Sequence, residues 1–352
     1  MVLPFSVGQN RVNSRIINDC HGHYTTAPNE LGDYRDAQKA ELEKDPLAVG
    51  SKGLLNVSDQ QIRDSLEGAQ LKLQAERGTD LTIFSPRASW MGHHIGNEHT
   101  SRFWTEHCNE LIHRITEIYP HNFVGVAQLP QSPGVGMDSS IHELERCVSE
   151  YGFIGCNLNP DPSGGYWQGP PLGDRYWYPF YEKMCELDIP AMIHVSAACN
   201  PVFHTTGSHY LGADTTAFMQ MLTSDLLLDF PDIKFIIPHG GGAVPYHWGR
   251  FRGLVQAMEN KLDLEELVLG NVFFDTCVYH QPGIDLLLDV IPAENILFAS
   301  ELLGAVRGVD PQTGHNYDDT KRYIDASPKA TKTEKELIFS GNAARVFSRL
   351  AV

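Results

Sequence analysis

Short apolar runs alternate with longer segments of helical periodicity along most of the chain. The runs are rich in Val, Ile, Leu and Phe and have the length of buried strands. The segments between them place apolar residues three and four positions apart, as amphipathic helices do. We expect strands at Arg15–Cys20, Leu81–Ser85, Phe123–Gln128, Ile154–Leu158, Ala191–Val195, Lys234–Ile237, Val272–Asp275 and Ile296–Ala299. We expect helices at Asp59–Arg77, Arg102–Tyr119, Ser139–Tyr151, Tyr176–Leu187, Thr215–Phe230, Tyr246–Met258 and Pro282–Ile291.

The order of these segments predicts the fold class. Strand-then-helix units in succession, eight strands in all, are typical of a closed parallel (β/α)₈ TIM barrel, with a doubly wound open sheet as the alternative. The first helix has favourable end signals, because Ser58 is a good N-cap and Gly78 is a good C-cap.

No linker or composition break divides the chain, so we expect one barrel over residues 15–352, preceded by an extension at residues 1–14. Three segments have the character of insertions, at about residues 24–56, 196–214 and 302–317. Each follows the carboxyl end of a predicted strand, which is the face of a barrel where active sites are built.

The composition disfavours some classes of binding partner. The chain has 352 residues, 42% of them hydrophobic, and a formal net charge of −17. Such an acidic protein is not expected to bind nucleic acids or anionic membranes. A small anionic substrate stays compatible with this charge, provided that arginines are placed locally in its pocket.

The cysteines and the apolar runs indicate in which cellular compartment the protein is found. The 7 cysteines form no CxxC pair, which favours reduced thiols over a disulfide framework. No run has the length of a membrane span, and the first residues lack the pattern of a signal peptide. We therefore expect a cytoplasmic protein.

Four of the predicted strands lead into residue types that bind metals: His21 and His23, His194, His239, and Glu301. Alternate residues of a strand point to the same side, so an HxH pair can offer two imidazoles to one ion. Imidazole and carboxylate together suit zinc, whose catalytic sites keep a position open for water. With 16 histidines in the chain each residue alone is a weak signal, but their joint occurrence at strand ends predicts a metal site.

This set of residues resembles the metal-binding pattern of the amidohydrolase superfamily, in its decarboxylase-like branch. That branch usually has aspartate after the eighth strand, where this chain has Glu301. From about residue 17 to residue 350 the chain resembles, more narrowly, the 4-oxalomesaconate hydratases. The blocks that carry this resemblance are Asp19–Pro28, Phe84–Ser89, Asn157–Gly165, His204–Tyr210, His239–Arg252, Phe274–Gly283 and Phe298–Glu301.

The resemblance implies a hydro-lyase that adds water to 4-oxalomesaconate and gives 4-carboxy-4-hydroxy-2-oxoadipate. This reaction belongs to the degradation of lignin-derived aromatic acids through protocatechuate and gallate. The implied cofactor is one Zn²⁺, with Mn²⁺ or Fe²⁺ as alternatives. Its implied ligands are His21, His23, His194 and Glu301.

The implied catalytic residues are Glu301, His239 and Tyr210. Glu301 would take the proton of water, His239 would support the ligands or shuttle protons, and Tyr210 would donate a hydrogen bond or a proton to the substrate. The alternative for His239 is a packing role beside the glycines at 240–242, and for Tyr210 a buried position in a lid.

A tricarboxylate substrate on an acidic protein needs cationic partners. Arginine binds a carboxylate through two parallel hydrogen bonds, which makes it the expected partner. The candidates for substrate binding are Arg87, Asn157, Arg250, Arg252 and Arg307. Some of the arginines could instead pair with acids at the barrel rim, and Asn157 could only shape a turn.

Other functions remain as alternatives. A non-oxidative aromatic-acid decarboxylase of the same superfamily is the nearest one, although Glu301 counts against it, and a hydrolase of carbon–carbon bonds is another. A barrel without catalysis, acting as a scaffold, is disfavoured by the intact set of candidate ligands. The partner expected from the sequence is a small polycarboxylate substrate, and we expect the chain to form a homo-oligomer, as related barrels do.

Overall fold

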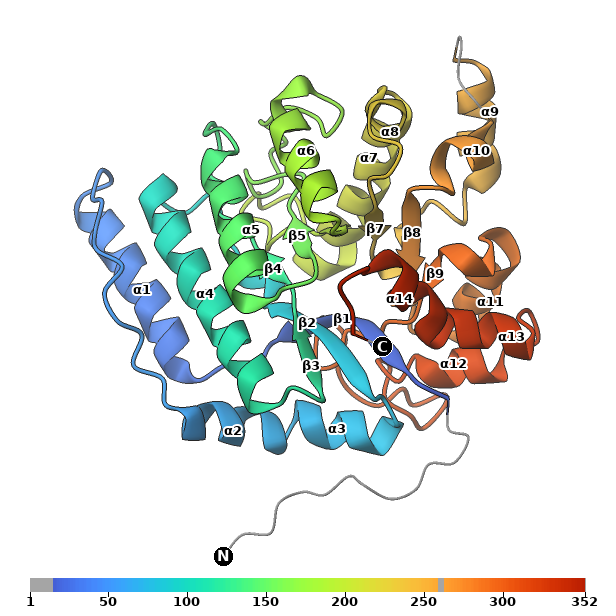
Figure 1. The fold of residues 1–352 in the computed structure, drawn as a ribbon, viewed down its shortest axis with the longest axis horizontal. Coiled ribbons are helices and arrows are strands. Elements are labelled where there is room, and N and C mark those ends of the chain that lie inside the picture. Colours follow the sequence, from blue (N-terminus) through green and yellow to red (C-terminus); the bar gives the residue numbers. More distant parts are fainter. Residues whose placement is uncertain (1–14, 259–262, 352) are drawn as a thin grey trace, which may run out of the picture.

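Parallel strands surround a central axis in the computed structural model, which describes residues 15–258 and 263–351 (Figure 1). The strands are β1 Asn18–Tyr24, β2 Leu81–Pro86, β3 Phe123–Gly125, β4 Ala127–Gln128, β5 Cys156–Leu158, β6 Ala191–Ile193, β7 Phe235–Ile237, β8 Val272–Asp275 and β9 Ile296–Leu297. They pair in the orders β1-β2-β3 and β4-β5-β6-β7-β8-β9, and all of these pairs are parallel. The predicted extension at residues 1–14 lies outside the described residues.

Two sets of backbone hydrogen bonds close the strands into a barrel. At Val126 the third strand passes from one neighbour to the other, because Val126 N donates to Phe84 O of β2 and the next residue donates to Gly155 O before β5. β3 and β4 are therefore one predicted strand with a break at Val126. On the other side, Cys20 N of β1 donates to Phe298 O, just after β9, over 2.9 Å. The predicted (β/α)₈ barrel is confirmed.

The first strand lies further along the chain than its apolar pattern predicts. The prediction was Arg15–Cys20, whereas β1 runs from Asn18 to Tyr24 and is buried throughout. The sequence pattern was misleading because the strand continues through polar residues that face the barrel interior. His21 and His23 consequently lie within the strand and not after it.

The helices are α1 Asn29–Lys44, α2 Asp59–Glu67, α3 Gln70–Arg77, α4 Glu98–Ile118, α5 Asp138–Tyr151, α6 Tyr178–Leu187, α7 Tyr210–Leu222, α8 Leu226–Asp229, α9 Trp248–Gln256, α10 Leu264–Val268, α11 Gln281–Val290, α12 Lys321–Ala326, α13 Lys332–Glu336 and α14 Asn342–Val346. The predicted helix at residues 59–77 is two helices, broken at Gly68 and Ala69. Its caps are as expected: Ser58 forms a capping box with Gln61, and Gly78 ends α3 at φ 72°.

The segment at residues 24–56, expected as an insertion, carries a helix of its own. Its helix α1 packs at the edge of the molecule beside α4 (Figure 1). Lys52, further along the segment, forms ion pairs with Glu106 and Glu110 of α4. These contacts fix the segment against the barrel wall.

The interior of the barrel is filled by one apolar ring below the site. One side chain comes from each barrel strand or from a residue within two positions of it, namely Cys20, Ile83, Val126, Ile154, Met192, Ile236, Phe273 and Leu297. Residues of α14 and the segment after it, Ala343, Val346, Phe347 and Leu350, pack against this ring. The barrel is therefore closed at that end, and its opposite end is free to hold a site.

Within the described residues, no helix combines the length and the apolar character needed to cross a membrane.

Candidate metal centre and active site

Three imidazoles from two barrel strands meet at the centre of the barrel. His21 Nε2 lies 2.9 Å from His23 Nε2, which in turn lies 3.3 Å from His194 Nε2. His21 and His23 point the same way because they are two residues apart on β1. Gly22 between them allows β1 to approach β2, since a Cβ there would lie 2.3 Å from Thr82 Cγ2.

The Nδ1 atoms of His21 and His194 have acceptors that settle which nitrogen carries the proton. His21 Nδ1 donates to the Asp275 carboxylate over 2.7 Å, and His194 Nδ1 donates to Val195 O over 2.8 Å. A neutral imidazole that donates through Nδ1 keeps a lone pair on Nε2. Both Nε2 lone pairs therefore face the shared centre.

Ser85 places the proton of His23 on Nδ1 as well. Asn157 Nδ2 donates to Ser85 Oγ over 3.1 Å, and the Ser85 hydroxyl lies within 3.2 Å of the Gly22 and Pro86 carbonyl oxygens, to which its one proton can be donated. The remaining lone pair of Ser85 accepts from His23 Nδ1, 2.7 Å away. His23 Nε2 is then deprotonated as well.

This donor set fits a divalent cation. Two ligands at ~2.0–2.1 Å from one ion lie roughly 2.9–3.4 Å apart at the usual bond angles, which matches the two Nε2 separations given above. Burial lowers the pKa values of His23 and His194 well below their ordinary value, so both imidazoles are neutral, as metal ligands must be. Without a cation, three lone pairs would face one another in a buried space.

Glu301 offers an oxygen ligand at the same place. Ligand atoms of His21, His23 and Glu301 lie within 4.8 Å of one another, and all three residues are buried. The N–H of Ala305 donates to Glu301 Oε1 over 3.2 Å, and the hydroxyl of Tyr279 donates to Oε2. A Cβ at Gly304 would lie 2.6 Å from Glu301 Cγ, so only glycine lets the chain turn this closely around the carboxylate.

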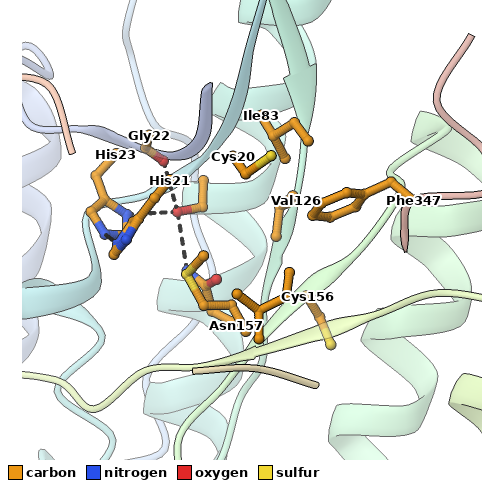
Figure 2. Close-up of a pocket in the computed structure, with 12 residues that line it drawn as sticks. Cys20, His21, Gly22, His23, Ile83, Val126, Cys156, Asn157 and Phe347 are labelled. Atoms are coloured by element: carbon orange, nitrogen blue, oxygen red, sulfur yellow. Dashed lines mark hydrogen bonds between the residues drawn. The ribbon is translucent and has the colours of Figure 1, made fainter. Parts of the chain in front are cut away.

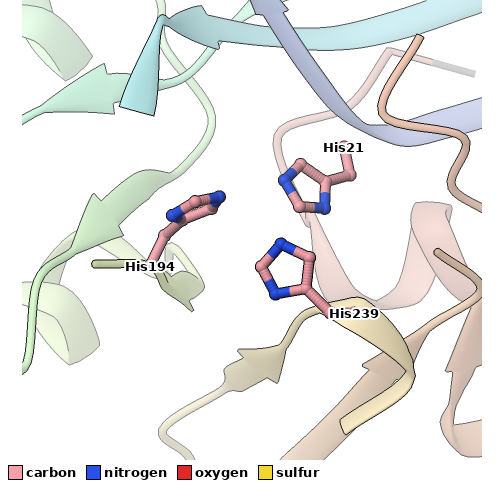
Figure 3. Close-up of side chains that lie close together, drawn as sticks. All are labelled: His21, His194 and His239. Carbon is pink, nitrogen blue, oxygen red and sulfur yellow. The ribbon is translucent and has the colours of Figure 1, made fainter. Parts of the chain in front are cut away.

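His239 faces the same centre, but a carboxylate lies beside its ring. Figure 3 shows its ring directed toward His21 and His194, and ligand atoms of these three residues also lie within 4.8 Å of one another. Burial alone would lower the pKa of His239, but the Asp214 carboxylate, 2.9 Å from Nδ1, raises it to about 9. Asp214 thus favours the protonated form of His239, which suits a proton carrier better than a metal ligand. Its buried Nε2 has no hydrogen-bond partner among the described residues.

Backbone strain gathers around this centre. His239, Tyr279 and Glu301 adopt φ values of 54°, 65° and 50°, which residues other than glycine rarely adopt. Each follows a neighbouring barrel strand, namely β7, β8 and β9. Such strain costs about 1–3 kcal/mol per residue and tends to persist at functional sites.

A cavity of about 470 Å³ opens next to the centre. His23, His194 and Glu301 form part of its wall, so a small molecule in the cavity would reach the centre. The buried side chain of Tyr210 lines the cavity as well, and its ring stacks on His239 at 5.4 Å. Burial raises the pKa of Tyr210, which keeps its hydroxyl a hydrogen-bond donor.

Two of the predicted arginines, Arg87 and Arg307, line this cavity. Neither forms an ion pair with an acid among the described residues, although Arg87 donates to Ser89 and stacks over Trp90. Burial, and then the charge of Arg307, lower the pKa of Arg87, so the two cations repel each other. An anion between them would relieve this repulsion.

The other predicted substrate residues lie elsewhere. Arg250 and Arg252 are exposed on α9 and do not line the cavity, because the glycine turn after His239 carries the chain away from the centre. Asn157 lies below the histidines, where it lines a second cavity of about 10 Å³ (Figure 2). Its hydrogen bond to Ser85 gives it a supporting role for His23 instead of a place in the larger cavity.

Several residues that hold the candidate site residues in place were not predicted from the sequence. Asp275 holds both His21 and the N–H of Gly240, Asp214 holds His239, and Tyr279 contacts Glu301. The position of Asp275 at the carboxyl end of a predicted strand was a usable signal. Asp214 and Tyr279 carried none, because Asp214 lies in the first turns of α7 and Tyr279 in the loop after β8, and the apolar pattern does not predict where either side chain points.

Comparison with known proteins identifies the family. The model of the amidohydrolase family matches residues 18–349. The chain belongs to the amidohydrolase family. Among the relatives of this amidohydrolase, a protein from a Sphingobium species named 2-keto-4-carboxy-3-hexenedioate hydratase is 58% identical over 335 residues, covering 95% of this chain and 97% of its own.

Solved structures agree with this assignment. The crystal structure of a 4-oxalomesaconate hydratase from Rhodopseudomonas palustris has a TM-score of 0.87 and 58% identity, with 95% of this chain and 96% of that chain covered. A dihydroxybenzoic acid decarboxylase from a Polaromonas species, solved with bound manganese, has a TM-score of 0.65 and 20% identity, covering 95% and 97% of the two chains, which shows a shared fold. The predicted resemblance and the predicted enzyme class, a hydro-lyase, are confirmed.

Proposed function

We propose that this amidohydrolase uses one divalent cation, Zn²⁺, to add water to 4-oxalomesaconate, giving 4-carboxy-4-hydroxy-2-oxoadipate in the degradation of lignin-derived aromatic acids. One observation carries the proposal: three buried Nε2 atoms and the Glu301 carboxylate lie together beside a cavity that two arginines line. The activities named for two relatives with 58% identity point to the same substrate class. The manganese in the decarboxylase structure leaves Mn²⁺ as an alternative cation.

The substrate isomer that suits this chemistry is the one in the name of the Sphingobium relative, 2-keto-4-carboxy-3-hexenedioate. Its double bond joins carbons 3 and 4 and is conjugated with the ketone at carbon 2. The oxygen of water bonds to carbon 4, because the electron pair of the double bond then moves toward the ketone oxygen. A proton delivered to carbon 3 completes the addition, so no oxidant or reductant is needed.

The residues divide this work by their charge and position. His21, His23, His194 and Glu301 would hold the cation, which supplies a Lewis acid when bound. Glu301 would also accept the proton that water loses, because its carboxylate lines the cavity beside the three imidazoles. This role gives the protein a base directly at the wall of the cavity.

Proton delivery and substrate binding fall to residues around the cation. His239 would deliver the proton, because the Asp214 carboxylate favours its protonated form and its Nε2 has no hydrogen-bond partner among the described residues. The neutral hydroxyl of Tyr210 donates to the ketone oxygen as negative charge develops there. Arg87 and Arg307 line the cavity and would bind the substrate carboxylates.

An ultraviolet assay tests the proposed reaction. Purified zinc-loaded protein is mixed with 2-keto-4-carboxy-3-hexenedioate and, in parallel, with a panel of hydroxybenzoic acids, while CO₂ is measured. We expect the conjugated absorbance of the first substrate to disappear without CO₂ release. Release of CO₂ from a hydroxybenzoic acid, with no change in the tricarboxylate, would instead favour the decarboxylase.

A further inference from the structure

Tyr279 reaches the Glu301 carboxylate from the loop that follows β8. Its hydroxyl donates to Oε2, while the backbone N–H of Ala305 donates to Oε1 over 3.2 Å. Each oxygen of the carboxylate thus has a donor of its own on a different segment. Two donors on opposite oxygens fix the plane of a carboxylate that would otherwise rotate about its last bond.

The loop that carries Tyr279 is itself held rigidly. Thr276 and Ala299 exchange two hydrogen bonds of 2.8 Å, which join the start of the loop to the end of β9. On the other side Val278 packs against the turn after His239, since a Cβ at Gly240 would lie 2.4 Å from Val278 Cγ2. The loop therefore fills the space between the His239 turn and Glu301.

The backbone of Tyr279 is strained in this position. Its φ of 65° places an aromatic residue in the left-handed region, where the side chain lies too close to the backbone. Glu301, its partner, has a φ of 50°. Both partners of this hydrogen bond thus have a strained backbone. Such strain persists where the surrounding structure requires a particular orientation of the side chains, often at functional sites.

We propose that Tyr279 is a positioning residue, which holds the Glu301 carboxylate in the orientation required for cation binding and for proton acceptance. This role rests on the metal site proposed above. Tyr279 does not line the 470 Å³ cavity, whereas Glu301 does, so the hydroxyl acts through Glu301 and not on the substrate. Outer partners of metal ligands change metal affinity or activity by about 10–100-fold when they are removed.

The variant Tyr279→Phe tests this role because it removes only the hydroxyl. Tyr178→Phe is a matched control, since the Tyr178 hydroxyl also donates to a carboxylate, Asp229, over 2.6 Å, on α6 and α8 away from the centre. Three quantities are measured for both variants and the unaltered protein: Zn²⁺ affinity by competition with a chelator, kcat and KM for hydration, and the melting temperature.

For Tyr279→Phe we expect Zn²⁺ affinity and kcat to fall by about 10–100-fold, while KM changes by less than about threefold. Tyr178→Phe should keep the Zn²⁺ affinity and kcat of the unaltered protein. A Tyr279→Phe protein with unchanged affinity and kcat, or with a lower melting temperature as its sole defect, overturns the positioning role. Failure of the unaltered protein to bind Zn²⁺ would instead overturn the proposed metal site.

Discussion

The Asp275 carboxylate accepts a hydrogen bond from His21 Nδ1 over 2.7 Å, and both side chains are buried. The other oxygen of Asp275 accepts the N–H of Gly240 over 2.9 Å and the N–H of Cys277 over 3.0 Å. One carboxylate therefore holds a candidate metal ligand and the turn that carries His239. Because it accepts three hydrogen bonds and donates none, it also requires His21 to keep its proton on Nδ1.

This relationship predicts the effect of Asp275→Asn. The amide oxygen can serve the two backbone N–H groups, which leaves the NH₂ group facing His21 and forces the proton of His21 onto Nε2. We expect Zn²⁺ affinity to fall by about 10–100-fold, measured by competition with a chelator. Asp289→Asn, at an exposed ion pair with Lys329, is the control. Unchanged Zn²⁺ affinity in Asp275→Asn would show that Asp275 does not set the tautomer of His21.

Glu301→Gln tests the proposed base. Glutamine has nearly the same shape, and its amide oxygen can still accept the Tyr279 hydroxyl, so we expect the fold to persist. The kcat for hydration should fall by about 10²–10⁴-fold, because a general base contributes that much. Steady-state kinetics measure this change, with the exposed Glu294→Gln as control. Turnover near that of the unaltered protein would remove Glu301 from the mechanism.

Arg87→Ala and Arg307→Ala test the binding of substrate carboxylates. A hydrogen bond to a charged group contributes about 1.5–3 kcal/mol, so we expect each variant to raise KM by about tenfold or more. The exposed Arg322→Ala, on α12, should leave KM unchanged. If KM for the tricarboxylate stays the same in both cavity variants, the two arginines do not contact the substrate.

The ion pair between Lys52 and Glu110 predicts a pH dependence of stability. Burial alone would raise the pKa of Glu110, but hydrogen bonds with His107 and Lys52 lower it from 4.5 to about 2. Because the pKa of Glu110 is lower in the folded state, its ionised carboxylate stabilises the fold at pH values above about 4.5. This stabilisation is lost as the pH falls from 4.5 toward about 2. Glu110→Gln should therefore lower the melting temperature at pH 7, with a difference that shrinks below pH 4.5. A difference that stays constant over this range would contradict the assigned pKa.

Parts of this molecule were predictable from local pattern. The barrel follows from apolar runs that alternate with helical periodicity, since both signals lie within short windows of the sequence. His21 and His23 could be paired because the period of a strand fixes the direction of alternate side chains. His194 and Glu301 could be added because parallel strands bring their carboxyl ends to one face.

Other parts depend on the path of connecting segments, which local pattern does not encode. Arg250 and Arg252 follow His239 closely in the sequence, yet three glycines with positive φ redirect the chain and leave both arginines exposed on α9. Asn157 lies within β5, but its side chain donates to Ser85 below the histidines. Tyr279 reaches Glu301 through a strained loop conformation that its sequence does not signal.

Anomalous diffraction at the zinc absorption edge, from crystals of the purified protein, tests the central claim most directly. We expect one strong peak at about 2.0–2.2 Å from the Nε2 atoms of His21, His23 and His194 and from a carboxylate oxygen of Glu301. A peak bound by other residues, or no peak from zinc-loaded crystals that retain hydratase activity, would contradict the account.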